Sequence, residues 1–181
     1  MVKITQSSQF SEVYLFTPEV FQDERGFFLE SFRDSWFDGI AQGLRFVQDN
    51  HSLSKKHALR GLHYQLEKPQ GKLIRVIEGQ VFDVMVDMRK NSKTFGQWQG
   101  FNLDAKIPQL LWIPPGFAHG FYTLSEKAQC LYRCTEYYHP QSERCLHYAD
   151  KTLNIAWPLS QPPIVSAKDL GGKSFLSADY F

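Results

Sequence analysis

Basic side chains that could bind an anion and move a proton are concentrated in residues 59–77. Four of its basic residues, one histidine, one lysine and two arginines, form the cluster considered first: Arg60, His63, Lys72 and Arg75. Guanidinium and ammonium groups bind phosphate, and an imidazole gains or loses a proton near neutral pH. Glycines divide the stretch at Gly61 and Gly71, and the apolar residues at 73–77 predict a strand. The cluster indicates phosphate binding combined with acid–base chemistry, or else an ordinary basic surface on a strand pair.

Bulk composition restricts the class of protein. The chain has 181 residues, which fits one domain spanning residues 1–181. A hydrophobic fraction of 43% and an aromatic fraction of 15% are typical of a folded, globular protein. The formal net charge is +1 and no block of like charge is present, so neither nucleic acid nor a membrane is expected as a partner.

Cysteine usage and hydropathy indicate the compartment. The three cysteines, Cys130, Cys134 and Cys145, form no CxxC pair and are odd in number, so we expect reduced thiols. No apolar run approaches the ~20 residues of a membrane helix, and the first residues do not follow a signal-peptide pattern. We therefore expect a soluble, cytoplasmic protein.

Turn signals between apolar segments indicate the fold. Strands are expected at residues 13–16, 27–32, 46–54, 73–88, 98–103, 110–113, 119–124 and 128–138. A turn is expected at Asp23–Gly26, where Gly26 can take positive φ. The range 73–88 is expected to be a hairpin that turns near Glu78-Gly79. Helical periodicity is nearly absent between residues 46 and 148. The pattern predicts an all-β protein, a jelly roll or double-stranded β-helix with short peripheral helices.

Two short helices are expected outside the strands. After Ser35, which fits an N-cap, apolar residues recur at helical spacing: Trp36, Phe37, Ile40, Ala41 and Leu44. Residues 166–169, Ser-Ala-Lys-Asp, match a capping box that would begin a second helix near the C-terminus. Both helices would lie at the periphery of the β-structure.

A small jelly roll with histidines is similar to the cupin superfamily, many of whose members bind a metal ion. Their ligand pattern resembles His-x-His on one strand, a nearby Glu, and a third His after Pro-x-Gly. Residues 114–119 match the last part, but Gln65 stands where the second histidine would be. Glutamine is an uncommon ligand for a transition metal. We therefore expect no metal and no other cofactor, and acid–base chemistry without a metal.

Two pairs of residues on the expected strands have open interpretations. Asp83 and Asp87 share one face of their strand; either both are solvated, or Asp83 lines a cavity. Tyr132 and Tyr138 share one face of theirs, and would lie roughly 20 Å apart if that strand were straight. The tyrosines are either core aromatics or residues that contact the two ends of a nucleotide-sugar.

Several short segments form a specific set in a specific order. They are Asp23–Phe28, Gln48–Asn50, Leu59–Gln65, Gln70–Leu73, Leu111–Phe121 and Trp157-Pro158. Together they resemble the dTDP-4-dehydrorhamnose 3,5-epimerase family over nearly the whole chain. The resemblance implies metal-free epimerisation at C3 and C5 of dTDP-4-dehydro-6-deoxy-D-glucose to dTDP-4-dehydro-L-rhamnose. That reaction belongs to dTDP-L-rhamnose biosynthesis, which supplies lipopolysaccharide and cell-wall polysaccharide.

The resemblance also implies roles for individual residues. His63 would be the base, with Asp169 as its partner, and Lys72 would stabilise an enolate. Tyr132 would return a proton from the opposite face. Further positions that match substrate contacts are Arg25, Glu30, Gln48, Asp49, Asn50, Arg60, Lys72, His119, Tyr138, Glu143 and Lys168. Among these, Tyr138 would stack on the thymine ring.

The resemblance further implies a homodimer whose sites are completed across subunits. In the family, contacts near Arg25 and Glu30 come from the partner subunit, so the N-terminal strands are expected to be an interface element. Alternatives are an epimerase acting at one centre only, a keto-isomerase of a related dTDP-4-keto-6-deoxysugar, and a non-catalytic sugar-binding jelly roll. The chain departs from the family at residues 146–148, Leu-His-Tyr, where Ile-x-Trp is usual.

Overall fold

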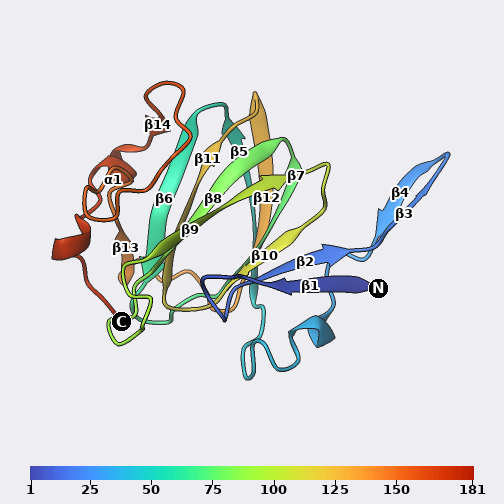
Figure 1. Ribbon diagram of the computed structural model, residues 1–181, viewed down its shortest axis with the longest axis horizontal. Helices are drawn as coiled ribbons and strands as arrows, with labels where there is room; N and C mark the ends of the chain where they lie inside the picture. Colours follow the sequence, from blue (N-terminus) through green and yellow to red (C-terminus); the bar gives the residue numbers. More distant parts are fainter.

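Two antiparallel β-sheets face each other in the computed structural model, which describes residues 1–181 (Figure 1). The first sheet contains, in spatial order, β1 (Val2–Gln6), β2 (Tyr14–Pro18), β10 (Leu110–Ile113), β7 (Lys72–Glu78), β12 (Lys127–Cys134) and β5 (Gln48–Lys55). The second contains β13 (Glu143–Cys145), β6 (Ala58–Gln65), β11 (Phe117–Thr123), β8 (Gln80–Asp87) and β9 (Trp98–Asp104), with β14 (Ile164–Val165) parallel to β6. Strand neighbours come from distant parts of the chain, as in a jelly roll. The predicted all-β class is confirmed.

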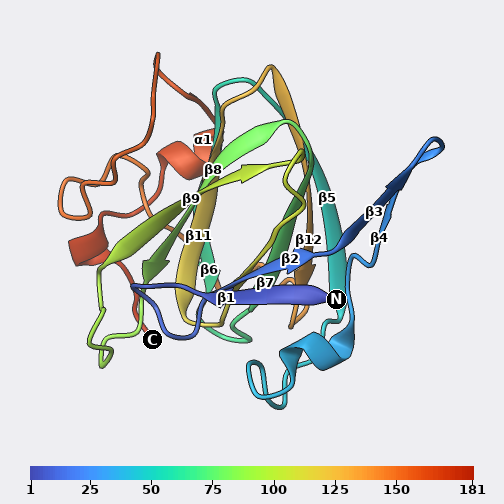
Figure 2. The ribbon, with the colours of Figure 1, turned by 45° about the vertical axis from the view of Figure 1, so that its right-hand side comes forward.

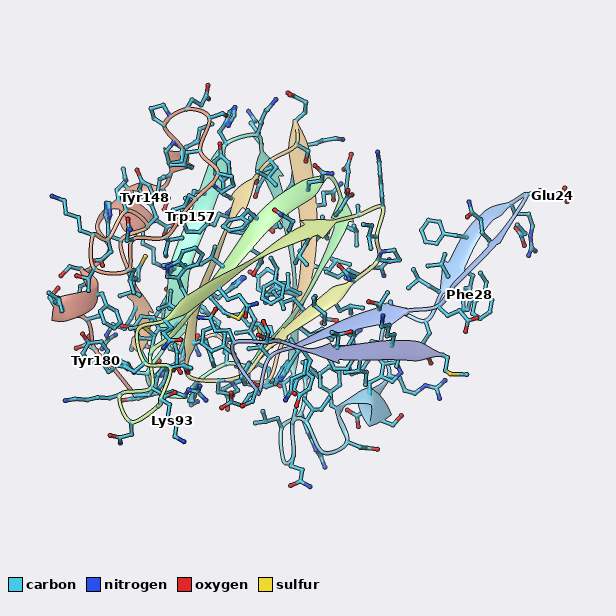
Figure 3. The ribbon with its side chains drawn as sticks, viewed as in Figure 1. Glu24, Phe28, Lys93, Tyr148, Trp157 and Tyr180 are labelled. Carbon is cyan, nitrogen blue, oxygen red and sulfur yellow. The ribbon has the colours of Figure 1, made fainter.

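A hairpin lies outside both sheets. It consists of β3 (Val20–Asp23) and β4 (Gly26–Leu29), and it extends away from the rest of the molecule (Figure 2). We call residues 20–29 the arm. Its turn lies at the predicted position, with Gly26 at φ +127°. Figure 3 shows Glu24 and Phe28 of the arm clear of the body.

Helical structure is limited to short turns. They are the 3₁₀ turn η1 (Asp34–Phe37), the α-helix α1 (Ala167–Leu170) and the 3₁₀ turn η2 (Phe175–Ser177). None of the helices has the length and hydropathy that crossing a membrane would require. The C-terminal helix begins as predicted, because the Ser166 side chain accepts a hydrogen bond from the backbone N–H of Asp169.

Three clusters of buried apolar side chains hold the sheets and their coverings together. The largest lies between the sheets and includes Met85 and Ile113. A second packs Val84 of β8 against Phe175 of the C-terminal segment. A third packs η1 against Trp112 of β10. Strand β8 is therefore buried on both faces, which fixes its position behind the site described below.

The expected hairpin at Glu78-Gly79 is wrong. Strand β7 belongs to the first sheet and β8 to the second, so the chain crosses between sheets at this point. Gly79 has φ +76°, and a Cβ atom there would lie 2.0 Å from the carbonyl oxygen of Lys127. The glycine is thus required at a sheet-to-sheet corner, whose local turn signal is the same as that of a hairpin.

The expected helix after Ser35 is also mostly wrong. Only one 3₁₀ turn forms, and Arg33 occupies its N-cap position. Trp36, Phe37 and Ala41 are buried, as their spacing suggested, whereas Leu44 is exposed. Gly39 and Gly43, at φ +79° and +77°, interrupt the helical backbone, because residues in a helix have negative φ.

The expected strand 128–138 ends early, at Cys134. Cys134 pairs with Gln48, where β5 begins, and with Lys72, where β7 begins, so neither neighbouring strand extends far enough to continue the ladder beyond it. Tyr132 and Tyr138 therefore do not lie on one straight strand, and the separation expected for a straight strand does not apply.

Candidate active site

A cavity of about 520 Å³ opens among β6, β7, β11, β12 and α1. Seven residues singled out from the sequence line it: Arg60, His63, Lys72, His119, Tyr132, Lys168 and Asp169. A second cavity of about 310 Å³ adds four others: Gln48, Asn50, Tyr138 and Glu143. His63, Lys72 and Tyr132 line both cavities. The two spaces therefore adjoin, and we call them together the site cleft.

His63 and Asp169 are in direct contact. His63 Nε2 lies 2.8 Å from Asp169 Oδ1, and the backbone N–H of Gly61 donates to Oδ2 at 3.1 Å. Burial opposes ionisation of Asp169, but the hydrogen bonds from His63 and Gly61 outweigh it and lower the pKa of this carboxyl. Asp169 is therefore a carboxylate at neutral pH.

The carboxylate determines which nitrogen of His63 carries a proton. Because ionised Asp169 can only accept, neutral His63 donates from Nε2, which leaves the lone pair on Nδ1. The carboxylate also stabilises the imidazolium that forms when Nδ1 takes up a proton. This is the arrangement of a general base that is oriented by a carboxylate.

Lys72 is half-buried beside this pair. It lies at the start of β7, and its Nζ is 3.5 Å from the carbonyl oxygen of His63. Desolvation is the largest influence and lowers the pKa of Lys72, while Cys134, Asp83 and Glu143 act in the opposite direction. A partly desolvated ammonium group interacts strongly with any negative charge that develops nearby.

Tyr132 approaches the cleft from the opposite sheet. It lies on β12 of the first sheet, whereas His63 lies on β6 of the second. Burial is the main reason that the pKa of Tyr132 is raised, so its phenol is protonated at neutral pH. A base and a proton donor therefore face the same space from two sides.

Asp83 does not lie in solvent. It is completely buried, and both its oxygens contact His119 Nε2, at 3.0 and 2.9 Å. Desolvation is the largest influence on His119 and lowers its pKa, although Asp83 acts in the opposite direction. Neither interpretation of Asp83 holds as stated, because the side chain is not solvated and is not among the residues that line the cleft. It lies behind His119 and orients that histidine, which does line the cleft.

A polar network lines the second cavity. Tyr138 donates its hydroxyl to Glu143 at 2.6 Å, and Lys168 forms an ion pair with the same carboxylate. The backbone N–H of Tyr138 donates to Gln48 Oε1 at 2.9 Å, and Gln48 in turn donates to Asn50 at 3.0 Å. The turn after β12 is thereby fixed against β5, so Tyr138 reaches the cleft despite lying beyond the strand.

Comparison with known proteins agrees with this geometry. The dTDP-4-dehydrorhamnose 3,5-epimerase family profile matches residues 7–177. A curated dTDP-4-dehydrorhamnose 3,5-epimerase from Shigella flexneri is 51% identical over 176 residues, which is 96% of this chain and 97% of that protein. One from Neisseria gonorrhoeae is 52% identical over 168 residues, 93% of this chain, and this chain spans about half (51%) of that longer relative. The chain belongs to the dTDP-4-dehydrorhamnose 3,5-epimerase family.

Solved structures of epimerases have the same fold. A Legionella pneumophila dTDP-6-deoxy-D-glucose-3,5-epimerase in complex with dTDP-4-keto-L-rhamnose is 47% identical, with a TM-score of 0.95 over 99% of this chain and 95% of that one. A 3'-monoepimerase from Streptomyces bikiniensis is 30% identical, with a TM-score of 0.88 over 95% and 88%. The predicted family and the prediction of an epimerase are confirmed. The fold itself is common to enzymes that invert one centre and two.

Three residues matched to family contacts lie outside the site cleft of this epimerase. Asp49 points to the other face of β5 and pairs with Arg133, because alternate residues of a strand face opposite sides. Arg25 and Glu30, in and just after the arm, form exposed ion pairs with neighbours in sequence. Their roles as substrate contacts stay predictions, because within one chain these side chains do not line the cleft.

The family resemblance did not indicate every residue of the cleft. Ser52 lines it, and its buried hydroxyl has no hydrogen-bond partner in the protein. Its parity with Gln48 and Asn50 on β5 was a usable signal. Ile164 also lines the cleft, but no sequence pattern shows that its segment packs there. Arg75, from the basic stretch, lies on the opposite face of β7 and in another cavity.

Proposed function

We propose that this epimerase inverts C3 and C5 of dTDP-4-dehydro-6-deoxy-D-glucose and yields dTDP-4-dehydro-L-rhamnose. One observation carries the proposal: the His63–Asp169 pair and the protonated Tyr132 reach one cleft from facing sheets. The Legionella complex with dTDP-4-keto-L-rhamnose supports the choice of ligand. The sugar's C3 and C5 protons are α to its C4 carbonyl, which makes them removable by a positioned base.

His63 begins the reaction. Its Nδ1 lone pair takes the proton from C3 or C5, and Asp169 stabilises the resulting imidazolium. The electron pair of the broken C–H bond moves into an enolate whose oxygen is the former C4 ketone. The Lys72 ammonium is the cation in the cleft that stabilises this charge. The role of Lys72 is thus electrostatic, and His63 alone removes the proton.

Tyr132 completes each inversion. Return of a proton to the face from which it came would restore the original centre, so a donor on the opposite face is needed. Tyr132 lines the cleft from the sheet facing His63 and is protonated at neutral pH. Its phenol would give the proton to the enolate carbon. Solvent would then reprotonate Tyr132 and deprotonate His63 before the second centre reacts.

The remaining side chains would hold the nucleotide. Arg60 lines the first cavity and carries a guanidinium suited to the diphosphate. Tyr138 borders the second cavity and is half exposed, so its ring is free to stack on thymine. Asn50, Glu143 and the other polar side chains there would hydrogen-bond to the nucleoside and sugar hydroxyls.

A homodimer would complete the cleft. The arm exposes four apolar side chains: Val20, Phe21, Phe27 and Phe28. Phe27 and Phe28 are 69% and 70% exposed, which is costly for a monomer in water. The arm extends away from the two sheets (Figure 2), and none of its residues lines the site cleft. Packing of the arm on a second copy would bury these rings and bring Arg25 and Glu30 to the partner's site.

We place the enzyme in the cytoplasm as one domain acting in dTDP-L-rhamnose biosynthesis. All three cysteines are free thiols, and two of them are buried, which fits a reducing compartment. The family assignment supports the pathway.

Incubation with the 4-keto substrate in deuterium oxide tests the proposal. We expect deuterium at both C3 and C5 by NMR, together with the L-configured product. Label at one carbon would favour a monoepimerase, which the Streptomyces neighbour shows is compatible with the fold. Binding without label would indicate a non-catalytic sugar-binding protein, and a ketone that moves to another carbon would indicate a keto-isomerase.

A further inference from the structure

One group near the base has no part in the proton transfers described above. Cys145 offers its Sγ beside His63 and Asp169, and the ligand atoms of these three residues all lie within 4.8 Å of one another. The residues come from β13, β6 and α1. Histidine nitrogen, thiolate sulfur and carboxylate oxygen are the three donor types that zinc accepts in proteins.

The fold holds these three residues on one side of β6. Cys145 and His63 are directly opposed in the antiparallel pair β13–β6, so their side chains point to the same face of the sheet. Helix α1 packs against β6 and is fixed by the Ser166 cap, which places Asp169 over that face. The arrangement therefore does not depend on flexible side chains meeting by chance.

We infer that His63, Cys145 and Asp169 form a site for a single Zn²⁺ ion that inhibits the enzyme. The inference rests on the proposed function only for the inhibition, not for the binding. Tetrahedral zinc holds its ligand atoms roughly 3.3–3.6 Å apart. His63 Nε2 and Asp169 Oδ1, now 2.8 Å apart, would separate slightly as zinc replaces the proton between them. The fourth position would hold water or a substrate oxygen.

Zinc at this position would disable the base. Coordination uses the lone pair of Nε2, so the single proton of the neutral His63 ring must shift to Nδ1. Nδ1 then has no lone pair with which to remove a substrate proton. Cys145 loses its thiol proton to solvent and binds as thiolate, while Asp169 exchanges its hydrogen bond to His63 for a bond to the metal. No electrons are transferred.

The thiol makes binding dependent on pH. Burial, with a smaller contribution from Asp169, raises the pKa of Cys145 to about 12, so this residue is a protonated, unreactive thiol in the metal-free enzyme. Binding of one zinc ion then releases one proton per site.

The test compares the full-length wild type with Cys145→Ser and Cys130→Ser. Cys130 is the control because it is a free thiol that lines the cleft but is not part of the trio. Zinc binding is measured by equilibrium dialysis without nucleotide, since the substrate's diphosphate would itself bind zinc. Cobalt(II) is added in parallel, because a thiolate ligand gives it a near-ultraviolet charge-transfer band.

We expect one zinc per chain, with a cobalt–thiolate band in the wild type and Cys130→Ser that is absent in Cys145→Ser. The zinc concentration for half inhibition should rise at least about tenfold in Cys145→Ser, whose activity in chelator should equal that of the wild type. Equal zinc sensitivity of Cys145→Ser, or no stoichiometric binding, would overturn the site. Binding with full activity would overturn the inhibition. Dialysis and spectra need no substrate, so failure of the epimerase reaction would be seen separately.

Discussion

Asp169→Asn should disable the enzyme by reversing the hydrogen-bond donor and acceptor at His63. The amide must satisfy two groups: the Gly61 N–H, 3.1 Å from Oδ2, and His63 Nε2, 2.8 Å from Oδ1. If its oxygen faces Gly61, its NH₂ donates to Nε2, and the proton of His63 must lie on Nδ1. The base then has the wrong tautomer. If the amide turns over, its NH₂ confronts the Gly61 N–H.

The magnitude follows from these two costs. Leaving a buried donor unsatisfied costs about 1–3 kcal/mol, and loss of the charge-assisted bond to the imidazolium costs about 1.5–3 kcal/mol more. Their sum, roughly 3–6 kcal/mol, corresponds to a loss of about 10²–10⁴ in kcat. KM should change less than kcat, because the amide retains the volume and cavity position of Asp169.

The assay is deuterium incorporation at C3 and C5, followed by NMR, with unfolding midpoints measured on the same samples. Ser166→Ala is the control: it removes the cap that accepts from the Asp169 N–H at 3.1 Å but keeps the carboxylate. It should cost about 1 kcal/mol of stability and much less activity. Asp169→Asn that retained more than about a tenth of wild-type kcat would refute the orienting role of the carboxylate.

Three further outcomes are expected. Tyr132→Phe should lose epimerised product at least about tenfold more than deuterium exchange, both measured by NMR, since removal depends on His63; equal losses would contradict the donor role. Replacing Phe27 and Phe28 by serine should yield monomers in light scattering and lower kcat/KM, whereas a monomeric wild type would argue against the arm as an interface. Asp87 is fully buried; burial raises its pKa, but bonds from Arg89 and its neighbours lower the pKa overall. This stabilisation is present above the unfolded pKa of ~3.9 and is lost as pH falls through the lower folded value. Asp87→Asn should therefore cost roughly 2 kcal/mol in urea unfolding at pH 7 and clearly less near pH 3; an equal cost would contradict this linkage.

Local patterns predicted the all-β class well because strands and turns have short-range causes. Alternating apolar residues, the glycine turn at residues 23–26 and the Ser166 cap all behave as expected. The same local rules failed at Gly79, where a turn residue serves a corner between sheets. They failed again after Ser35, where two glycines interrupt an apolar periodicity that still directs burial.

The residue types of the site could be read from the sequence, but which residues belong to it could be read only in part. Residue types suited to a base, a cation and a proton donor are properties of the side chains themselves. Strand parity alone separates Asn50, which faces the cleft, from Asp49, which faces away. No comparable rule indicates that Arg25 and Glu30 lie far from their own cleft, since that depends on where the arm leaves the body.

The sequence by itself determined the chemistry available to this protein: an imidazole among basic side chains in one stretch, and a tyrosine on a later strand. Only the tertiary structure decided which groups act together. His63 and Asp169 are 106 residues apart, and Cys145 stands opposite His63 through the pairing of β13 with β6. Such contacts depend on how the sheets and α1 pack around shared cores, and that packing depends on the whole chain.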